Sequence, residues 1–414
     1  SAENLDLNRD FIKLDAKETR SLVQLFRRLD PEIFIDNHVS DGADYQHVVT
    51  LLATQHNKLG GGIGKCMNQT FVPLIYADMK KKGYDMVPYV NDFSSTPDHG
   101  WTEFYDLPRF SSGYAAMWQT MAFVPETHML KPYKQRVEAT YALMRSFIKM
   151  AGQNADAIQD ARMKDRDSLW KKNLFALNWK ADTSRYTMIP FKGYTAGYKK
   201  SEVSGQQRLY YDREKPFTKE VPFYNYFVAT QKMTAPKAYI IKQGWNDVID
   251  RLKWNDIAVQ RLEHDSIMEV SAYYIDKYET VPHPYEKHYL HRNVQVQKTT
   301  EKIQLLKGDY IVPLDQLGKR YLIETLEPTA PDAFFAWNFF DAVLQEKEYF
   351  SDYVFEETAA RLLRNDATLR QLLEEKQRTD TAFAKDGEAQ LEFIYKHSPY
   401  AEPEYMRYPV FRLE

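Results

Sequence analysis

The sequence predicts an α/β fold that is followed by a β-rich region and a helical C-terminal segment. Three observations support this prediction. A helical pattern leads into a short apolar stretch of β-formers near Ile33, alternating stretches dominate after about residue 180, and the helical pattern returns from Ala333. We therefore expect three parts along the chain: 1–175, 180–328 and 329–414.

The first part alternates between predicted helices and predicted buried strands. Residues 15–29 repeat apolar side chains at helical spacing, with Asp15 as the expected N-cap. The apolar run Ile33–Asp36 predicts a buried strand, and Met121–Val124 predicts a second one. Further helices are expected over about 66–83, 132–152 and 154–172. A helix that leads into a buried strand is typical of α/β proteins.

Two stretches of the first part lack a clear period. The glycines from Gly60 to Gly64 predict a flexible turn. They are a weak candidate for a phosphate loop, because no Lys-Ser/Thr pair follows at the required spacing and no clear strand precedes them. Residues 91–109 are rich in Pro, Asp, Gly and Ser and predict a long loop.

The second part contains short alternating stretches separated by turn residues, which is the pattern of an antiparallel sandwich or open barrel. These stretches are 185–191, 207–211, 237–241, 267–274, 293–298, 309–313 and 320–324. A short helix is expected over about 245–252. In the third part, helices are expected over 337–346, 352–364 and 368–385.

Composition and charge exclude several classes of protein. The chain has 414 residues, of which 43% are hydrophobic and 27% charged, as in ordinary globular proteins. A formal charge of -3 gives no reason to expect nucleic acid as a partner, and no apolar run is long enough for a membrane span. The single cysteine, Cys66, excludes an internal disulfide and a cysteine-based zinc site. Since the chain opens with Ser1 and no leader pattern, we expect any signal peptide to have been removed.

His38 and Glu126 each follow a predicted buried strand, where open α/β sheets bind their ligands. An imidazole at His38 could ligate zinc or carry protons, and the plainer interpretation is a hydrogen-bonded structural histidine. Glu126, shielded by apolar neighbours, could have a raised pKa and act as a general base. The pattern alone slightly favours a surface glutamate in a turn. His128, two residues further on, is expected to be an exposed turn residue.

Two other groups of polar residues are candidates for binding. Asn8 and Arg9 could hold a carboxylate, because arginine forms a bidentate fork and asparagine adds a neutral donor. Without further context, an arginine this close to the beginning of the sequence is usually solvated. The His-x-x-Glu at His283–Glu286, with further histidines up to His291, could ligate a metal, but its prolines favour a loop between strands. No Gly-x-Ser-x-Gly elbow supports a serine hydrolase.

Three of these pieces occur together in an order and spacing that resemble the zinc carboxypeptidase family. They are NLDLNRDF (Asn4–Phe11), PEIFIDNHVSDG (Pro31–Gly42) and FVPETHMLKPY (Phe123–Tyr133). The resemblance covers about residues 1–150 and corresponds to the second half of that family's catalytic domain. It implies a partial doubly wound mixed sheet over 1–175. The end of the sequence, from Leu326 onward, resembles the C-terminal extension of some bacterial members.

The resemblance also implies roles for individual residues. Asn8 and Arg9 would hold the terminal carboxylate of a peptide substrate, His38 would be a zinc ligand, and Glu126 would promote the water. The family tyrosine that closes over bound substrate is best matched by Tyr114, because Phe110 lacks the hydroxyl. The resemblance implies one zinc ion per intact catalytic domain, a peptide with a free C-terminus as substrate, and a periplasmic or secreted location.

The sequence departs from the family pattern in one respect. The family has an upstream His-x-x-Glu that supplies the other two zinc ligands, and this sequence begins just before the Asn-Arg pair. We therefore expect the chain to be the rear part of a carboxypeptidase whose N-terminal portion is missing, and this part alone to hold zinc poorly. Two hypotheses follow. One is a zinc metallocarboxypeptidase, and the other is a non-catalytic relative that binds peptides or glycans.

Overall fold

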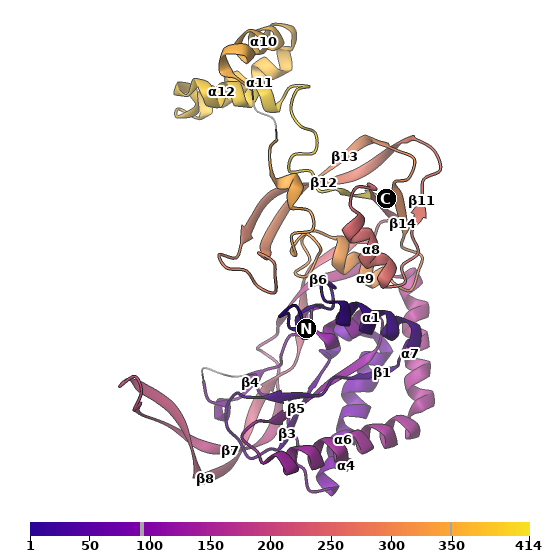
Figure 1. Cartoon of the computed structure of the whole chain (residues 1–414), viewed down its shortest axis with the longest axis vertical. Helices are drawn as coiled ribbons and strands as arrows, with labels where there is room; N and C mark the ends of the chain where they lie inside the picture. Colours follow the sequence, from indigo (N-terminus) through magenta and orange to yellow (C-terminus); the bar gives the residue numbers. More distant parts are fainter. Residues whose placement is uncertain (92–94, 348–349) are drawn as a thin grey trace.

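A mixed four-stranded sheet lies at the centre of the first part of the molecule (Figure 1). The computed structural model describes residues 1–91, 95–347 and 350–414. Strand β5 (Met121–His128) is paired along one edge with β1 (Ile33–Ile35) and then β2 (His38–Ser40), both parallel to it. Along its other edge runs β3 (Val49–Ala53), which is antiparallel. The two predicted buried strands are therefore neighbours in one sheet.

Helices cover both faces of this sheet, as expected for an α/β protein. Met121 and Phe123 of β5 pack into one core with residues of α4 (Val72–Lys81) and α6 (Tyr133–Gln153). The intervening Ala122 packs into the opposite core with α1 (Lys17–Leu29) and α5 (Ser111–Met117). Side chains alternate across a strand, so β5 supplies both cores at once.

The remaining elements of this part are short, apart from one long helix. They are η1 (Leu7–Arg9), α2 (His56–Leu59), α3 (Gly61–Cys66), η2 (Met67–Phe71), η3 (Pro97–His99), β4 (Trp101–Thr102) and α7 (Ala155–Lys171). The predicted helices over 15–29, 66–83, 132–152 and 154–172 are confirmed. Asp15 is not the N-cap of α1, however, because Ala16 holds that place and Asp15 pairs with Arg251 at 2.9 Å.

The glycine-rich segment is helical, which corrects the expected flexible turn. Gly60 ends α2 and α3 begins at Gly61, where φ is +62°. The carboxylate of Asp165, on α7, accepts hydrogen bonds from the backbone N–H groups of Gly62 and Ile63, both at 2.7 Å. A Cβ on Gly61 would lie 2.3 Å from this carboxylate. The glycine therefore lets Asp165 cap the helix.

The β-rich region forms one sheet and two ribbons. Strands β10 (Ala238–Ile241), β11 (Gln260–Arg261), β12 (Ser266–Thr280), β13 (His291–Leu305), β14 (Tyr310–Pro313) and β15 (Val410–Leu413) form a six-stranded sheet. The ribbons are β6 (Leu174–Ala181) with β9 (Phe227–Thr234), and β7 (Thr187–Lys200) with β8 (Gln207–Tyr224), to which β4 adds. Helix α8 (Asn246–Trp254) lies where a short helix was predicted. Residues 320–324 were wrongly predicted as a strand and belong to α9 (Lys319–Leu326).

The hydrophobic cores cross the expected boundaries between the three parts. One core joins Phe11 and Tyr114 to Tyr239 and Tyr408. Another joins Trp101 of β4 to side chains of β7 and β8. The region 180–325 is strand-dominated, as predicted, and many of its side chains pack into the same cores as the α/β part. Ile240, Val270 and Leu305 belong instead to a core within the six-stranded sheet. The boundaries at 175 and 328 stay predictions.

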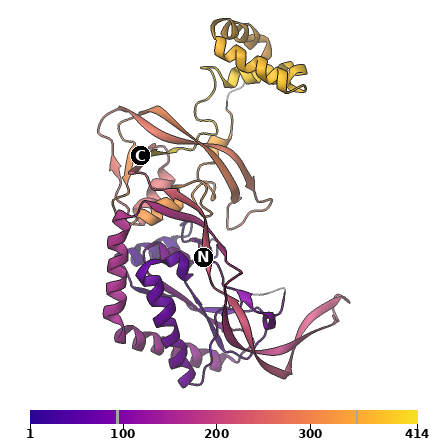
Figure 2. The same ribbon diagram turned by 180° about the vertical axis from the view of Figure 1, so that it is seen from behind.

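The helical C-terminal segment lies at one end of the molecule, in both views (Figures 1 and 2). Helices α10 (Asp352–Asn365), α11 (Ala367–Thr379) and α12 (Gly387–Lys396), with the short η5 (Phe383–Lys385), pack around their own small core. The helix predicted over 337–346 is wrong except for the short η4 (Asp341–Leu344). The aromatic side chains Phe334, Phe335 and Trp337 are buried from a series of turns instead.

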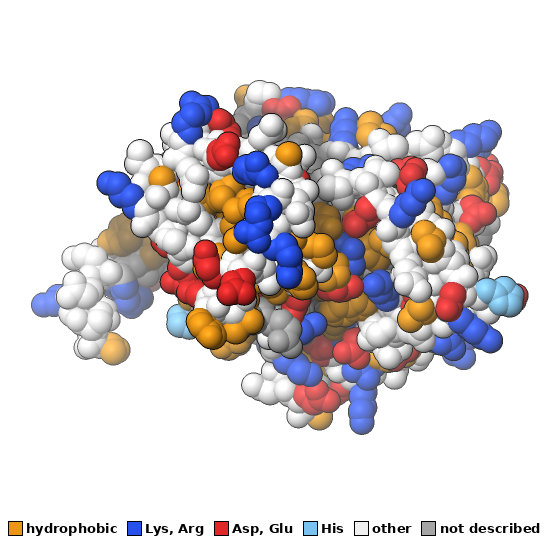
Figure 3. Space-filling view, turned by 90° about the horizontal axis from the view of Figure 1, so that it is seen from above, with side chains coloured by type: hydrophobic (Ala, Val, Ile, Leu, Met, Phe, Trp, Pro, Cys, Tyr) orange, Lys and Arg blue, Asp and Glu red, His pale blue; other side chains and the backbone are white. Residues whose placement is uncertain are grey.

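The surface is mixed in charge, as the composition predicts. Blue and red side chains alternate across the face drawn in Figure 3. In the described ranges, no helix combines the length and apolarity that a bilayer span requires.

Gly61→Ala should destabilise the protein. An alanine there takes up a left-handed backbone and displaces the Asp165 cap, which together cost roughly 2–4 kcal/mol. The free energy of unfolding in urea measures this loss. Gly62→Ala is the matched control, because a Cβ at Gly62 meets nothing nearer than 3.5 Å. It should be neutral or stabilise by up to about 1 kcal/mol. Equal losses in the two variants would contradict the role of Gly61.

His47 joins the β7–β8 ribbon to the α/β part. Its Nε2 accepts from the backbone N–H of Lys192 at 3.1 Å, so its Nδ1 donates to the Asp85 carbonyl at 2.9 Å. Only the neutral imidazole can do both. Burial lowers the pKa of His47 to about 4.

This histidine should make the fold sensitive to acid. Its contribution to stability is complete above pH 6.5 and is lost as the pH falls toward 4, because the unfolded chain binds the proton more readily. Between pH 7.5 and 4.5, the free energy of unfolding of the wild type should fall by about 2–3 kcal/mol more than that of His47→Gln. Urea titrations at several pH values measure the difference. His264→Gln, at an exposed site, should keep the wild-type pH dependence. A parallel pH dependence in His47→Gln and wild type would refute the assignment.

Candidate active site

His38 and Glu126 lie directly opposite each other on adjacent strands. The two residues are register partners of the parallel pair β2–β5. His38 Nδ1 lies 3.7 Å from Glu126 Oε1. The sequence placed both residues after the ends of strands, whereas His38 begins β2 and Glu126 lies within β5. Strand β5 continues past the predicted end because β2 pairs with it up to His128 and β3 pairs with it up to Thr127.

Glu126 has the properties of a general base. Burial raises its pKa to about 7, with Asp36 and Asp41 adding to the rise and His38 opposing it. Its Oε2 is buried and makes no hydrogen bond with the residues that the structure describes. A carboxylate with a free oxygen and a pKa near neutrality can take a proton from water and release it again.

Asp36 fixes the orientation of His38. His38 Nε2 lies 3.0 Å from Asp36 Oδ2, in the two-residue gap between β1 and β2. This hydrogen bond is the main reason that the pKa of His38 is raised. It directs Nδ1 toward Glu126, so Nδ1 is the atom available to a metal or a substrate.

Asn8 and Arg9 are brought to the same region through Ser111, at the start of α5. The Asn8 side-chain oxygen accepts from the backbone N–H of Ser111 at 2.8 Å. The Ser111 side chain also helps to lower the pKa of Asp36. The Arg9 guanidinium is half-buried and lies 4.6 Å from the ring centre of Phe110. Phe110 thus supports the arginine, a role that the sequence did not suggest.

Tyr89 is a further candidate residue that the sequence analysis did not single out. Burial and then the charge of Glu126 raise its pKa, whereas Arg9 lowers it, so its hydroxyl lies within electrostatic range of both. Its backbone runs beside β3, with its N–H donating to the Leu51 carbonyl at 3.0 Å. No periodicity marks this Pro-containing stretch, and only its tyrosine content could have pointed to it.

Tyr114 is not placed to close over a substrate. Its side chain is fully buried among Phe11, Phe26 and Trp118. Its hydroxyl lies 2.6 Å from Asn255 Oδ1. Releasing it would break this core, so the expectation drawn from the family pattern does not fit this arrangement.

The histidine-rich loop between β12 and β13 does not form a metal site. Glu286 accepts from the backbone N–H of Asp6 at 2.9 Å, and His288 Nε2 lies 2.7 Å from Asp15. His291 pairs with Asp341 at 3.0 Å, and His283 is exposed. These contacts separate the side chains, and the loop is a strand connection as expected. His128, expected to be exposed, is fully buried and contacts the Ala43 carbonyl at 2.9 Å.

A zinc ion is not accommodated by the described residues alone. Across 1–91, 95–347 and 350–414, no three His, Cys, Asp or Glu side chains are grouped so as to hold a metal. His38 offers one imidazole nitrogen, and a catalytic zinc takes three protein ligands.

Comparison with known proteins reveals distant carboxypeptidase relatives. The chain is 21% identical over 347 residues to carboxypeptidase 2 of Trichophyton tonsurans, and the match covers 80% of this chain and 62% of the relative. Carboxypeptidase 2 of Trichophyton rubrum and probable carboxypeptidase 2 of Arthroderma benhamiae are 21% identical with the same coverage. The chain thus spans less than two thirds of the length of these relatives. No family model and no solved structure matches it significantly.

Asp36→Asn should lower the pKa of His38, because the Asp36 hydrogen bond is the largest cause of its rise. An NMR titration of the His38 ring protons in metal-free buffer measures the change. Asp41→Asn is the control, since Asp41 acts on Glu126 and Tyr89 rather than on His38. An unaltered His38 titration in Asp36→Asn would show that another group sets this pKa.

Proposed function

We propose that this chain is part of a metallocarboxypeptidase that removes the C-terminal residue of peptides. The observation that carries the proposal is the pairing of His38 with a buried Glu126 whose pKa is near 7. The distant relationship to proteins named carboxypeptidase 2 supports the same class of reaction. We further propose, from the family resemblance alone, a periplasmic or secreted location.

In the proposed reaction, Arg9 and Asn8 hold the terminal carboxylate of the peptide. The guanidinium provides a planar pair of donors, and the Asn8 amide group adds another. This grip selects peptides with a free C-terminus and sets the last peptide bond at a fixed distance from Glu126. Exopeptidase specificity then follows from positioning.

Glu126 supplies the acid and base chemistry in this proposal. It takes a proton from the water that attacks the scissile carbonyl carbon, and it passes that proton to the leaving amine as the C–N bond breaks. We propose that the Tyr89 hydroxyl, whose pKa responds to the charges of both Glu126 and Arg9, donates a hydrogen bond to the bound substrate. Asp36 acts through His38 as a positioning residue.

Binding of zinc in this proposal requires ligands in addition to those that the described residues provide. His38 Nδ1 would be one ligand, and a bound zinc would lower the pKa of its water and polarise the carbonyl. Measuring zinc per chain in the protein expressed from its complete gene tests this part. One tightly bound zinc supports it, and none contradicts it.

A non-catalytic, peptide- or glycan-binding relative is the second candidate function. The observation that favours it is that the described residues provide no group of three metal ligands around His38. Binding of peptides without release of a terminal amino acid would support this second function over the first.

Arg9→Ala should reduce kcat/KM for peptides with a free C-terminus by about 30- to 1000-fold, as expected for a charge-assisted pair worth roughly 2–4 kcal/mol. Release of the terminal amino acid from the protein expressed from its complete gene measures the effect. C-terminally amidated peptides should be poor substrates and lose much less. Arg9→Lys should recover only part of the activity, because an ammonium lacks the planar fork.

Arg28→Ala is the control for this measurement, because Arg28 is an exposed arginine on α1 that has no proposed role in the site. It should behave as wild type. Equal losses on free and amidated peptides in Arg9→Ala would reject the carboxylate clamp.

A further inference from the structure

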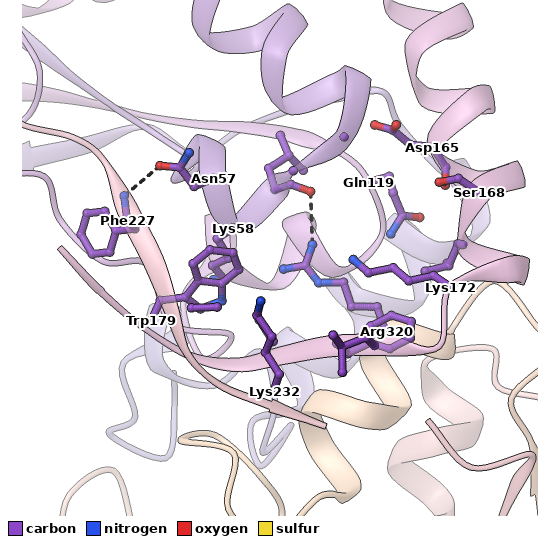
Figure 4. Close-up of a pocket in the computed structure, with 18 of the residues that line it drawn as sticks. Asn57, Lys58, Gln119, Asp165, Ser168, Lys172, Trp179, Phe227, Lys232 and Arg320 are labelled. Atoms are coloured by element: carbon purple, nitrogen blue, oxygen red, sulfur yellow. Dashed lines mark hydrogen bonds between the residues drawn. The ribbon is translucent and has the colours of Figure 1, made fainter. Parts of the chain in front are cut away.

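A polar pocket of about 610 Å³ lies between the start of α3, the end of α7 and the β6–β9 ribbon (Figure 4). None of the candidate active-site residues lines it. Four cationic side chains and a single carboxylate do: Lys58, Lys172, Lys232, Arg320 and Asp165.

Two of the four cations are already neutralised. Lys58 lies 3.7 Å from the buried Asp106, and Arg320 donates to Glu324 at 2.6 Å. The carboxylate of Asp165 is occupied by the two backbone N–H groups that it caps. By contrast, Lys172 and Lys232 form no ion pair with any residue in the part of the chain that the structure describes.

The cationic groups converge. Figure 4 shows the ammonium groups of Lys172 and Lys232 and the guanidinium of Arg320 directed into one space. Lys172 directly follows α7, Lys232 lies on β9 and Arg320 on α9. Burial and then the Arg320 charge lower the pKa of Lys172, whereas the charges of Glu324 and Asp165 oppose this shift. Positive charge is therefore concentrated here without an equal amount of negative charge, and a bound anion would relieve it.

The rest of the lining is apolar and aromatic. Trp179 of β6 and Phe227 of β9 lie on the ribbon side of the pocket, with Leu169 of α7 across from the ribbon. Such walls suit a flat apolar group beside the charged end of a ligand.

We propose that this pocket binds a small molecule that carries an oxyanion, either a phosphate or a carboxylate, next to an aromatic group. The oxyanion lies between Lys172 and Lys232, and the aromatic group packs against Trp179. The inference is independent of the proposed peptidase function, because the two sites share no residue.

Isothermal titration calorimetry at low ionic strength tests the proposal with phenyl phosphate and benzoate as probes. Benzyl alcohol and inorganic phosphate each lack one half of the expected ligand. The wild type should bind phenyl phosphate or benzoate more tightly than it binds benzyl alcohol or inorganic phosphate. Whichever aromatic anion has the lower Kd shows whether the ligand carries a phosphate or a carboxylate. Lys172→Gln combined with Lys232→Gln should weaken this binding by about tenfold or more.

Lys171→Gln is the matched control, because Lys171 is an exposed neighbour that does not line the pocket. It should bind the probes as wild type does, and all variants should keep the wild-type Tm. The proposal is overturned if neither aromatic anion binds saturably, if the double variant binds as tightly as wild type, or if Lys171→Gln causes the same loss.

Discussion

The pairing of strands along β5 is the constraint on which the rest of the candidate site depends. β5 is held on one edge by β1 and β2 and on the other by β3, so its side chains are fixed on both faces. Glu126 lies within this strand, where water cannot easily solvate its charge. The same burial that makes the carboxylate costly to ionise gives it a pKa near 7, at which a general base is most effective.

The other site residues are tied to this strand by short contacts. Asp36 orients His38 from the gap between β1 and β2, and the backbone N–H of Ser111 donates to Asn8. Tyr89 reaches the same region because its backbone is bonded to β3. Groups that are far apart in the sequence are therefore held on rigid elements. Such preorganisation is what binding and proton transfer require.

The sequence predicted those helices and strands whose apolar residues recur with a clear helical or alternating period. It failed where every residue of an element is buried, or where a strand pairs with strands far away in the sequence. Residues 320–324 were misread because every residue of α9 is buried, which removes the amphipathic pattern. Strand β15 was missed because its partners β10 and β12 lie more than 100 residues away.

The same distinction holds for the site. His38 and Glu126 stood out because each follows an apolar run, and the motifs around them resemble a known family. Tyr89 has no local signal, and Tyr114 matched a motif although its ring fills the core. The direction of these two tyrosine side chains depends on tertiary packing, so it cannot be predicted from the spacing of residues along the sequence.

The most direct test of the central claim is the effect of Glu126→Gln on peptide hydrolysis by the protein expressed from its complete gene. Glutamine keeps the size of the side chain and removes its basicity. If Glu126 is the general base, kcat for release of the terminal amino acid should fall by about 10²–10⁴-fold with little change in KM. Turnover by Glu126→Gln within a few fold of wild type would contradict this account.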